Sequence, residues 1–411
     1  MRILFLHRNF PAQFRHLISH LINDPGYDLA FITNRKDAKI KGMTVGFYDL
    51  TRQVSEHTHS YLKNYEEFII HGQGTARVAL KLKDTGFYPD VIIGHTWGQN
   101  LFIQEVFPDA PLIGYFEWFY NSKGSDADFG RTSELPLDKR ANIRIKNSPI
   151  LLDLISCRTG LVPTMWQKKQ FPEFFHDKLN VIHDGIDTDI CKPSPSRNGL
   201  NLPRLKLSIP SDCEIITYST RGMEAYRGFP QFMEAASAIL KERPEAHVVI
   251  AGEDRVCYGA QLAKGQSYKQ MMTEKFPMDP DRIHFTGLLS YPEYLTLLQS
   301  SWVHVYLTYP FVLSWSMLEA MAAGCIVAAS STPPVLEVLR DNENGFLFDF
   351  FYPYQLAQKI TYILENQKKL QPVRDSARKT ICMHYDLKDC LKKQLHVISY
   401  VIGKEMEGNM A

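Results

Sequence analysis

The sequence lacks several features that would point to particular classes of protein. It has no apolar run of about 18 residues, the length that a membrane-spanning helix needs. Lys and Arg together number 46 against 45 Asp and Glu, so no excess of charge favours nucleic acid as a partner. The seven cysteines include no Cys-x-x-Cys pair, which removes the usual signs of a zinc site or a disulfide framework. We expect a cytoplasmic protein without a leader segment, and peripheral contact with the inner face of a membrane stays open.

A glycine-rich phosphate loop is also absent from the start of the chain. Residues 2–7 (RILFLH) predict a buried strand, and the turn after them carries Asn9, Pro11 and Gln13 but no glycine. This turn is therefore not a dinucleotide-binding fingerprint. Asn9 and Gln13 are predicted either to contact an acceptor or only to form the loop that caps the next helix.

What the chain does contain is a series of apolar runs that end in polar or aromatic residues. Residues 89–100 (PDVIIGHTWGQN) end with His95 and Trp97, and residues 111–120 (PLIGYFEWFY) with Glu117. The carboxyl ends of parallel strands form the ligand-binding edge of an open α/β sheet. His95 and Trp97 are predicted to contact a sugar there, with packing of Trp97 under the loop as an equal alternative. Burying a carboxylate is unfavourable unless it is paired or functional, so a catalytic role is predicted for Glu117.

The most informative stretch runs from residue 302 to residue 350. Two apolar strand-like runs flank a segment with helical spacing, which predicts a strand, a helix and a strand in one unit. Ser314, Trp315 and Ser316 open this helix, whose free N–H groups and dipole suit a phosphate. Glu319 follows on the first or second turn, within reach of sugar hydroxyls. A phosphate and a ribose together indicate a nucleotide.

Ser314 to Ser330 resembles the nucleotide-sugar-binding motif of family 4 retaining glycosyltransferases, which have the GT-B fold. In that family two glutamates flank this loop, the first contacting the donor sugar and the second the ribose. The second corresponds to Glu319, whereas Phe311 stands where the first is expected. The family also has a histidine near the anomeric carbon of the sugar, and Glu117 stands at that position.

The resemblance extends through the second half of the chain. The family places two basic residues in the loop after the first strand of the donor domain, where they hold the pyrophosphate. Arg221 and Arg227 match them in place and spacing. Two guanidinium groups beside a helix start suit a diphosphate that leaves as an anion. The segment Thr286, Gly287 and Leu288 corresponds to the strand end where the family reads the base through backbone groups.

The residues and the resemblance together predict an α/β protein of the GT-B fold, with two doubly wound, Rossmann-like domains facing across a cleft. We expect an acceptor-side domain over residues 1–187 and a nucleotide-sugar-binding domain over residues 188–385. A terminal helix in residues 386–411 is expected to cross back to the first domain. The base, the sugar and the oligomeric state stay open.

The expected reaction is retaining transfer of a sugar from a nucleotide-diphosphate sugar to a hydroxyl-type acceptor. That acceptor is a glycan, a lipid-linked sugar, a protein or a small molecule. Glu117, Arg221 and Arg227 are the expected catalytic residues, and the resemblance implies no metal and no cofactor. Two alternatives stay open: a nucleotide-sugar epimerase, and a non-catalytic GT-B subunit that assists an active glycosyltransferase.

Overall fold

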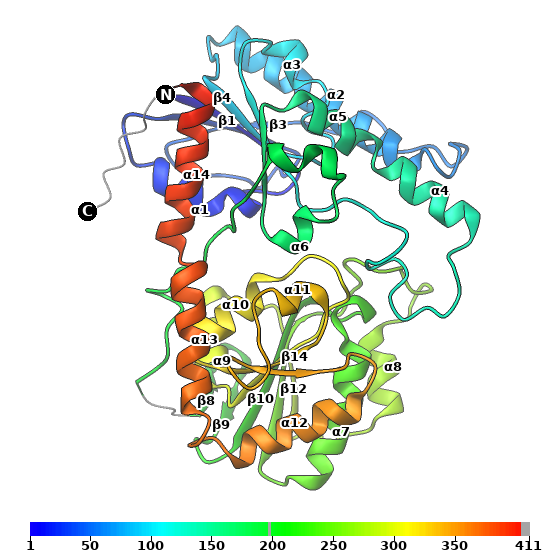
Figure 1. Ribbon diagram of the computed structural model, residues 1–411, viewed down its shortest axis with the longest axis vertical. Coiled ribbons are helices and arrows are strands. Elements are labelled where there is room, and N and C mark those ends of the chain that lie inside the picture. Colours follow the sequence, from blue (N-terminus) through cyan, green and yellow to red (C-terminus); the bar gives the residue numbers. More distant parts are fainter. Residues whose placement is uncertain (196–198, 404–411) are drawn as a thin grey trace. The chain divides into compact units, whose positions relative to one another are not determined.

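The computed structural model describes residues 1–195 and 199–403 and consists of two compact units (Figure 1). Unit 1 comprises Met1–Gly185 and Leu387–Ala411, and unit 2 comprises Ile186–Asp386. The sequence places these divisions after residues 187 and 385. Residues 404–411 of the expected terminal helix lie outside the described residues. No described helix is long and apolar enough to cross a membrane.

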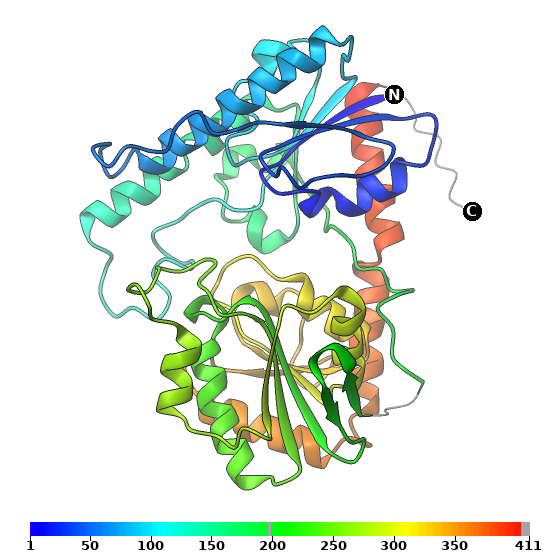
Figure 2. The same cartoon turned by 180° about the vertical axis from the view of Figure 1, so that it is seen from behind.

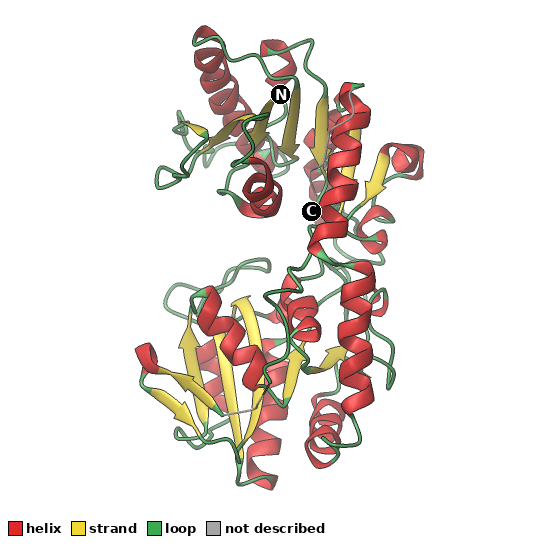
Figure 3. Ribbon diagram, turned by 90° about the vertical axis from the view of Figure 1, so that its left-hand side faces the viewer, coloured by secondary structure: helices red, strands yellow, loops and turns green. Residues whose placement is uncertain are grey.

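Unit 1 is built on a seven-stranded parallel sheet with the strand order β3-β2-β1-β4-β5-β6-β7 (Figure 3). The chain runs outward from β1 to β3 and then restarts at β4 on the other side of β1. Open α/β sheets bind ligands at such a switch point, outside the carboxyl ends of the strands. The strands are β1 (Arg2–Leu6), β2 (Asp28–Thr33), β3 (Thr44–Phe47), β4 (Val91–His95), β5 (Leu112–Tyr115), β6 (Thr159–Val162) and β7 (Leu179–Val181).

Helices cover both faces of this sheet because successive side chains of a strand point in opposite directions. Leu4 and Leu6 pack toward α2, α3 and α5, whereas Ile3 and Phe5 pack toward α1 and α14. Figure 2 shows α1 in dark blue and α14 in red along the same face. The helices of unit 1 are α1 (Arg15–Leu21), α2 (Lys63–Asp84), α3 (Ile103–Val106), α4 (Leu137–Lys146), α5 (Ser148–Ser156), α6 (Met165–Lys168) and α14 (Leu387–Ile402).

Unit 2 repeats the plan with six parallel strands in the order β12-β11-β10-β13-β14-β15. Its switch point lies between β10 and β13. A separate antiparallel hairpin, β8 (Leu200–Leu202) with β9 (Leu207–Ile209), precedes the sheet. The sheet strands are β10 (Glu214–Gly222), β11 (Ala246–Glu253), β12 (Ile283–Gly287), β13 (Val303–Tyr306), β14 (Ile326–Ser330) and β15 (Phe346–Phe348).

Apolar helix faces close the core of unit 2. Met317 and Met321 of α10 pack with Val327 of β14, and Phe232 of α7 stacks on Tyr218 of β10 with ring centroids 4.6 Å apart. The helices are α7 (Phe229–Glu242), α8 (Tyr268–Lys275), α9 (Tyr291–Ser300), α10 (Trp315–Ala322), α11 (Pro333–Leu336), α12 (Pro353–Glu365) and α13 (Gln371–His384). Two parallel, doubly wound sheets confirm the expected α/β class.

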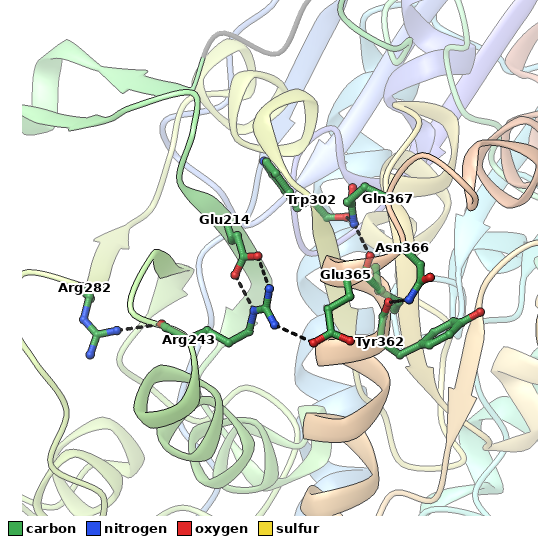
Figure 4. A network of polar contacts seen from close by, with 9 residues as sticks. Glu214, Arg243, Arg282, Trp302, Tyr362, Glu365, Asn366 and Gln367 are labelled. Atoms are coloured by element: carbon green, nitrogen blue, oxygen red, sulfur yellow. Dashed lines mark hydrogen bonds and ion pairs between the residues drawn. The ribbon is translucent and has the colours of Figure 1, made fainter.

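The amino-terminal edge of the unit 2 sheet is fastened by a polar network around Arg243 (Figure 4). The Arg243 guanidinium donates to both carboxylate oxygens of Glu214 at 2.5 and 2.7 Å, and to Glu365 of α12 at 3.2 Å. Arg282 donates to the Arg243 carbonyl at 3.1 Å. These bonds join β10, α7 and α12 at the edge opposite the carboxyl ends of the strands.

Candidate functional site

The carboxyl edge of unit 2 contains a small hollow, open to solvent, at the switch point between β10 and β13. Both arginines expected to hold a diphosphate border it, as do both serines at the start of α10. Its lining residues are Tyr218, Ser219, Thr220, Arg221, Arg227, Tyr258, Tyr306, Leu307, Ser314 and Ser316. Segments around residues 220, 258, 306 and 315 thus meet at one place.

Arg227 is a buried cation at the bottom of the loop between β10 and α7. It ends a short 3-10 helix (Ala225–Arg227), and Gly228 with φ +64° then turns the chain into α7. Its Nη1 atom donates to the hydroxyls of Tyr306 and Thr308 at 3.0 and 2.8 Å and to the Val312 carbonyl at 3.1 Å. Hydroxyls and a carbonyl orient the guanidinium, and no described carboxylate forms an ion pair with it.

Arg221 presents the second cation of the hollow. It lies near the carboxyl end of β10 with its side chain exposed, and it forms no hydrogen bond or ion pair with any described residue. An unpaired guanidinium beside a buried one gives this edge a local positive charge. Such a pair can bind two phosphate groups through charge-assisted hydrogen bonds.

The start of α10 adds backbone N–H groups to the same hollow. Ser314 is the N-cap, and its hydroxyl accepts from the Ser316 backbone N–H at 3.3 Å and from the Ser316 hydroxyl at 3.0 Å. The Tyr306 hydroxyl accepts from the Ser314 N–H at 2.9 Å. Trp315 turns away and packs on the core formed by α10 and α13. The two serines therefore border the hollow, whereas the Trp315 side chain does not.

Glu319 lies on the second turn of α10, buried and outside the lining of the hollow. Its Oε1 atom accepts from the Tyr291 hydroxyl at 3.2 Å, and the same hydroxyl lies 3.0 Å from the Cys191 sulfur. Burial and the Glu319 charge raise the pKa of Tyr291, which keeps the phenol protonated as a donor. The carboxylate predicted to contact a ribose is thus already fixed by a tyrosine of α9.

Thr286 and Gly287 end β12, two strands away from β10, and Leu288 follows directly. Gly287 has φ +66°, which directs the chain into the loop before α9. The Leu288 carbonyl accepts from Arg204 at 3.2 Å, and its side chain is exposed. None of the three lines the hollow. A nucleotide base bound by this segment would therefore lie beside the hollow, along the edge of the sheet.

Phe311, which stands in place of the family's first glutamate, belongs to an aromatic cluster. Its ring lies 5.7 Å from that of Tyr226 and 5.3 Å from that of Tyr258. Tyr226 in turn stacks on Tyr309 at 4.6 Å. The aromatic cluster thus includes, at Phe311, the position at which the family pattern has a carboxylate.

In unit 1, the switch point between β1 and β4 carries a group of packed aromatic rings. The ring of His95 lies 4.5 Å from that of His7 and 4.2 Å from that of Trp97. His7 and His95 are fully buried, and burial together with the neighbouring His95 holds the pKa of His7 well below its usual range. Arg8 donates twice to the Trp97 carbonyl, at 3.0 and 2.8 Å, and fixes this loop.

Glu117 joins the same group from the loop after β5. Its Oε2 atom lies 3.3 Å from His95 Nε2, and its Oε1 atom accepts from Gln13 at 3.3 Å. The Asn9 backbone N–H donates to His7 Nδ1 at 2.8 Å. Four residues singled out in the sequence, Gln13, His95, Trp97 and Glu117, therefore meet at one edge of unit 1. Asn9 adjoins them through its backbone.

Sequence reasoning missed His7, Tyr258 and the anchoring role of Arg8. His7 ends the first apolar run, so the rule that strand ends carry site residues would have found it. Tyr258 lies in a connection after β11 that carries no motif, and its position follows only from the folded chain. Among the described residues, no group of His, Cys, Asp and Glu is arranged to hold a metal ion.

Two family models match the chain, one for each half. Residues 25–191 match the glycosyl transferase family 4 group, and residues 204–380 match the glycosyl transferases group 1. In a curated relative, an uncharacterized glycosyltransferase of Methanocaldococcus jannaschii, 122 residues align at 24% identity. This alignment spans 29% of the chain and only 31% of that relative.

Solved structures resemble the chain over its full length. HepE of Anabaena in complex with UDP-glucose has a TM-score of 0.69 at 15% identity, with 97% of this chain and 100% of that chain covered. Sucrose-phosphate synthase of Thermosynechococcus elongatus has a TM-score of 0.73 at 14% identity, with 98% and 99% covered. At these identities the likeness defines the fold, which is GT-B. With the matches of both halves, the chain belongs to the family 4, group 1 glycosyltransferases.

Proposed function

We propose that this glycosyltransferase moves a sugar from a nucleoside-diphosphate sugar to a hydroxyl acceptor, with retention of configuration at the anomeric carbon. The observation that carries the proposal is the hollow of unit 2, where Arg221 and Arg227 have no carboxylate partner among the described residues and adjoin the start of α10. A diphosphate supplies the missing negative charge. UDP-glucose is the first donor to test, because HepE was solved with it.

In the proposed reaction, the bond between the anomeric carbon and the diphosphate oxygen breaks while the acceptor oxygen bonds to the same face of the sugar. Negative charge grows on the leaving diphosphate. Arg221, Arg227 and the N–H groups at the start of α10 stabilise that charge more in the transition state than in the ground state. The acceptor proton passes to the departing diphosphate oxygen or to a protein base. The proposal requires no metal.

Glu117 is the proposed carboxylate of the reaction. Gln13 donates to one of its oxygens, His95 Nε2 lies 3.3 Å from the other, and its side chain is 17% exposed, so it is oriented and still accessible. An ionised carboxylate at this position can stabilise the oxocarbenium-like sugar or accept the acceptor proton. Covalent attack by Glu117 is the less favoured third route. His95 and Trp97 are proposed to form the acceptor-side surface with Gln13 and Asn9.

The proposal is tested by incubating the chain with UDP-glucose and other nucleotide sugars, with and without glycan, lipid-linked and small-molecule acceptors. We expect nucleoside diphosphate to be released with an acceptor, and proton NMR to show the donor's anomeric configuration in the product. An isomerised sugar without released diphosphate would indicate an epimerase. Tight donor binding without turnover across all acceptors would favour the non-catalytic subunit.

The role of Glu117 has its own comparison. Glu117→Gln should lower kcat about 10²- to 10⁴-fold, the range of general acid–base catalysis, and leave nucleoside diphosphate affinity close to that of the parent. Glu105→Gln, at an exposed glutamate of α3, is the matched control. Unchanged turnover in Glu117→Gln would leave Glu117 with a structural role, and a sugar trapped on Glu117 would show that it attacks covalently.

A further inference from the structure

Glu224 is a fully buried carboxylate in the loop between β10 and α7 that has no role in the reaction proposed above. Its Oε2 atom accepts from three consecutive backbone N–H groups, those of Cys257, Tyr258 and Gly259, at 3.0, 2.8 and 3.1 Å. Successive N–H groups that converge in this way form an anion-binding nest. Here the protein's own carboxylate fills the nest. A buried carboxylate requires such partners to be tolerated.

The segment held by Glu224 fits closely against the loop that carries it. The Met223 N–H donates to the Glu253 carbonyl at 2.9 Å. A Cβ atom on Gly222 would lie 2.5 Å from the Arg255 carbonyl oxygen and 2.8 Å from the Cys257 sulfur, so the contact requires glycine. Residues 222–224 and 253–259 therefore form one assembly, with the carboxylate at its centre.

Tyr258 is the side chain that this assembly brings to the hollow. It lines the hollow together with Arg221 and Arg227, and the centroid of its ring lies 5.1 Å from the Arg227 guanidinium carbon. Its ring also contacts the aromatic cluster through Phe311, with the ring centroids 5.3 Å apart. A cation near an aromatic face is attracted to it, so the position of Tyr258 helps to fix the position of Arg227.

We propose that Glu224 is a positioning residue of the diphosphate-binding hollow. By binding the three N–H groups of 257–259 it holds Tyr258 against Arg227 and thereby presents the guanidinium to the diphosphate. Glu224 does not itself touch the ligand in this account. The inference rests on the proposed binding of a diphosphate in unit 2. The competing explanation is that Glu224 only stabilises the fold of unit 2.

The test measures the affinity of the full chain for UDP and for pyrophosphate by calorimetry. Glu224→Ala removes the acceptor oxygen and should weaken both about tenfold or more, whereas Glu224→Gln keeps a neutral acceptor and should weaken them less. Tyr258→Ala should reproduce the loss seen in Glu224→Ala. The loss in the double variant should then be smaller than the sum of the two single losses, because both residues act through Arg227.

Glu234→Ala and Glu234→Gln are the matched controls, since Glu234 is an exposed glutamate of α7 and loses the same charge. Both should bind like the parent. Hydrogen exchange should also rise at the N–H groups of 257–259 in Glu224→Gln. A role confined to fold stability would leave the affinity unchanged in every variant that remains folded.

The outcomes separate the two proposals. If the parent binds neither UDP nor pyrophosphate, the diphosphate proposal fails and the inference falls with it. If the parent binds but Tyr258→Ala binds equally well, or if the losses in the double variant add, the positioning role of Glu224 is overturned. If Glu224→Ala does not fold, the affinities of Glu224→Gln, Tyr258→Ala and their double variant provide the same test.

Discussion

Arginines at the two edges of the unit 2 sheet differ in how their charge is balanced. At the amino-terminal edge, Arg243 binds Glu214 through two hydrogen bonds and also pairs with Glu365. At the carboxyl edge, Arg221 and Arg227 have no carboxylate within ion-pair distance in the described chain, although Arg227 is buried. Arg243 is therefore paired within the fold, whereas we propose that an anionic ligand pairs with Arg221 and Arg227.

The comparison explains why one arginine is structural and the others are functional candidates. A buried or half-buried charge is tolerated where it is paired. Hydroxyls and a carbonyl orient Arg227 in place of a directly bonded carboxylate, and the charge of the nearby Glu224 acts on it without an ion-pair contact. Its charge therefore remains available to a ligand. Substitutions at the two edges should have opposite effects, on ligand affinity at one and on stability at the other.

The largest loss of affinity for a diphosphate is expected from Arg227→Ala. Removing a buried charge-assisted contact weakens binding by about 1.5–3 kcal/mol, which is about 10- to 150-fold in Kd. Calorimetry with UDP and pyrophosphate measures the loss. A variant that folds and binds both with the parent's affinity would show that Arg227 does not contact the diphosphate.

Arg243→Ala should do the reverse. It leaves the Glu214 carboxylate, whose side chain is only 12% exposed, without its partner, and should lower the free energy of unfolding by about 1–2 kcal/mol. Urea denaturation measures the change, and UDP affinity at low temperature should equal that of the parent. A clear loss of affinity without a loss of stability would remove the contrast between the edges.

Glu319→Gln should have an intermediate effect. The amide still accepts from the Tyr291 hydroxyl, but it forms a weaker bond to ribose hydroxyls than a carboxylate does. We expect UDP to bind several-fold more weakly, and pyrophosphate, which has no ribose, to bind as before. Equal weakening of both ligands would mean that Glu319 acts on the hollow and not on the nucleoside.

Among the substitutions at the carboxyl edge, Arg221→Ala should weaken ligand binding least. This guanidinium is exposed, so water and salt screen its interaction, and exposed pairs typically change affinity by about two- to fivefold. The difference between variant and parent should shrink as salt is raised. A difference that does not depend on salt would place Arg221 in a desolvated contact instead.

Much of the fold could be predicted because its signals are local. Buried parallel strands read as continuous apolar runs, and the helices between them carry apolar residues at helical spacing. The approach of Arg221, Arg227, Ser314 and Ser316 to one hollow follows from the same logic. Each lies at or just after the carboxyl end of β10 or β13, the two strands that flank the switch point.

Contacts between distant segments could not be predicted in this way. Glu224 binds backbone groups up to 35 residues away, and no side-chain pattern marks a backbone nest. The fixing of Glu319 by Tyr291 and of Phe311 by Tyr226 and Tyr258 likewise depends on how loops pack after the strands are in place. These contacts determine which side chains a ligand can touch. The class of site can therefore be predicted from the sequence, whereas its specificity cannot.

The claim that the carboxyl edge of unit 2 binds a diphosphate is tested most directly by thermal unfolding. The parent is measured with pyrophosphate, UDP, ADP, GDP and the matching nucleotide sugars. A ligand that binds only the folded chain raises stability by RT ln(1 + [L]/Kd), about 2.7 kcal/mol at 100-fold excess over Kd. We predict that pyrophosphate and at least one nucleoside diphosphate raise Tm, and that the Arg221→Ala/Arg227→Ala double variant loses this shift. No shift with any of these ligands at millimolar concentration would contradict the account.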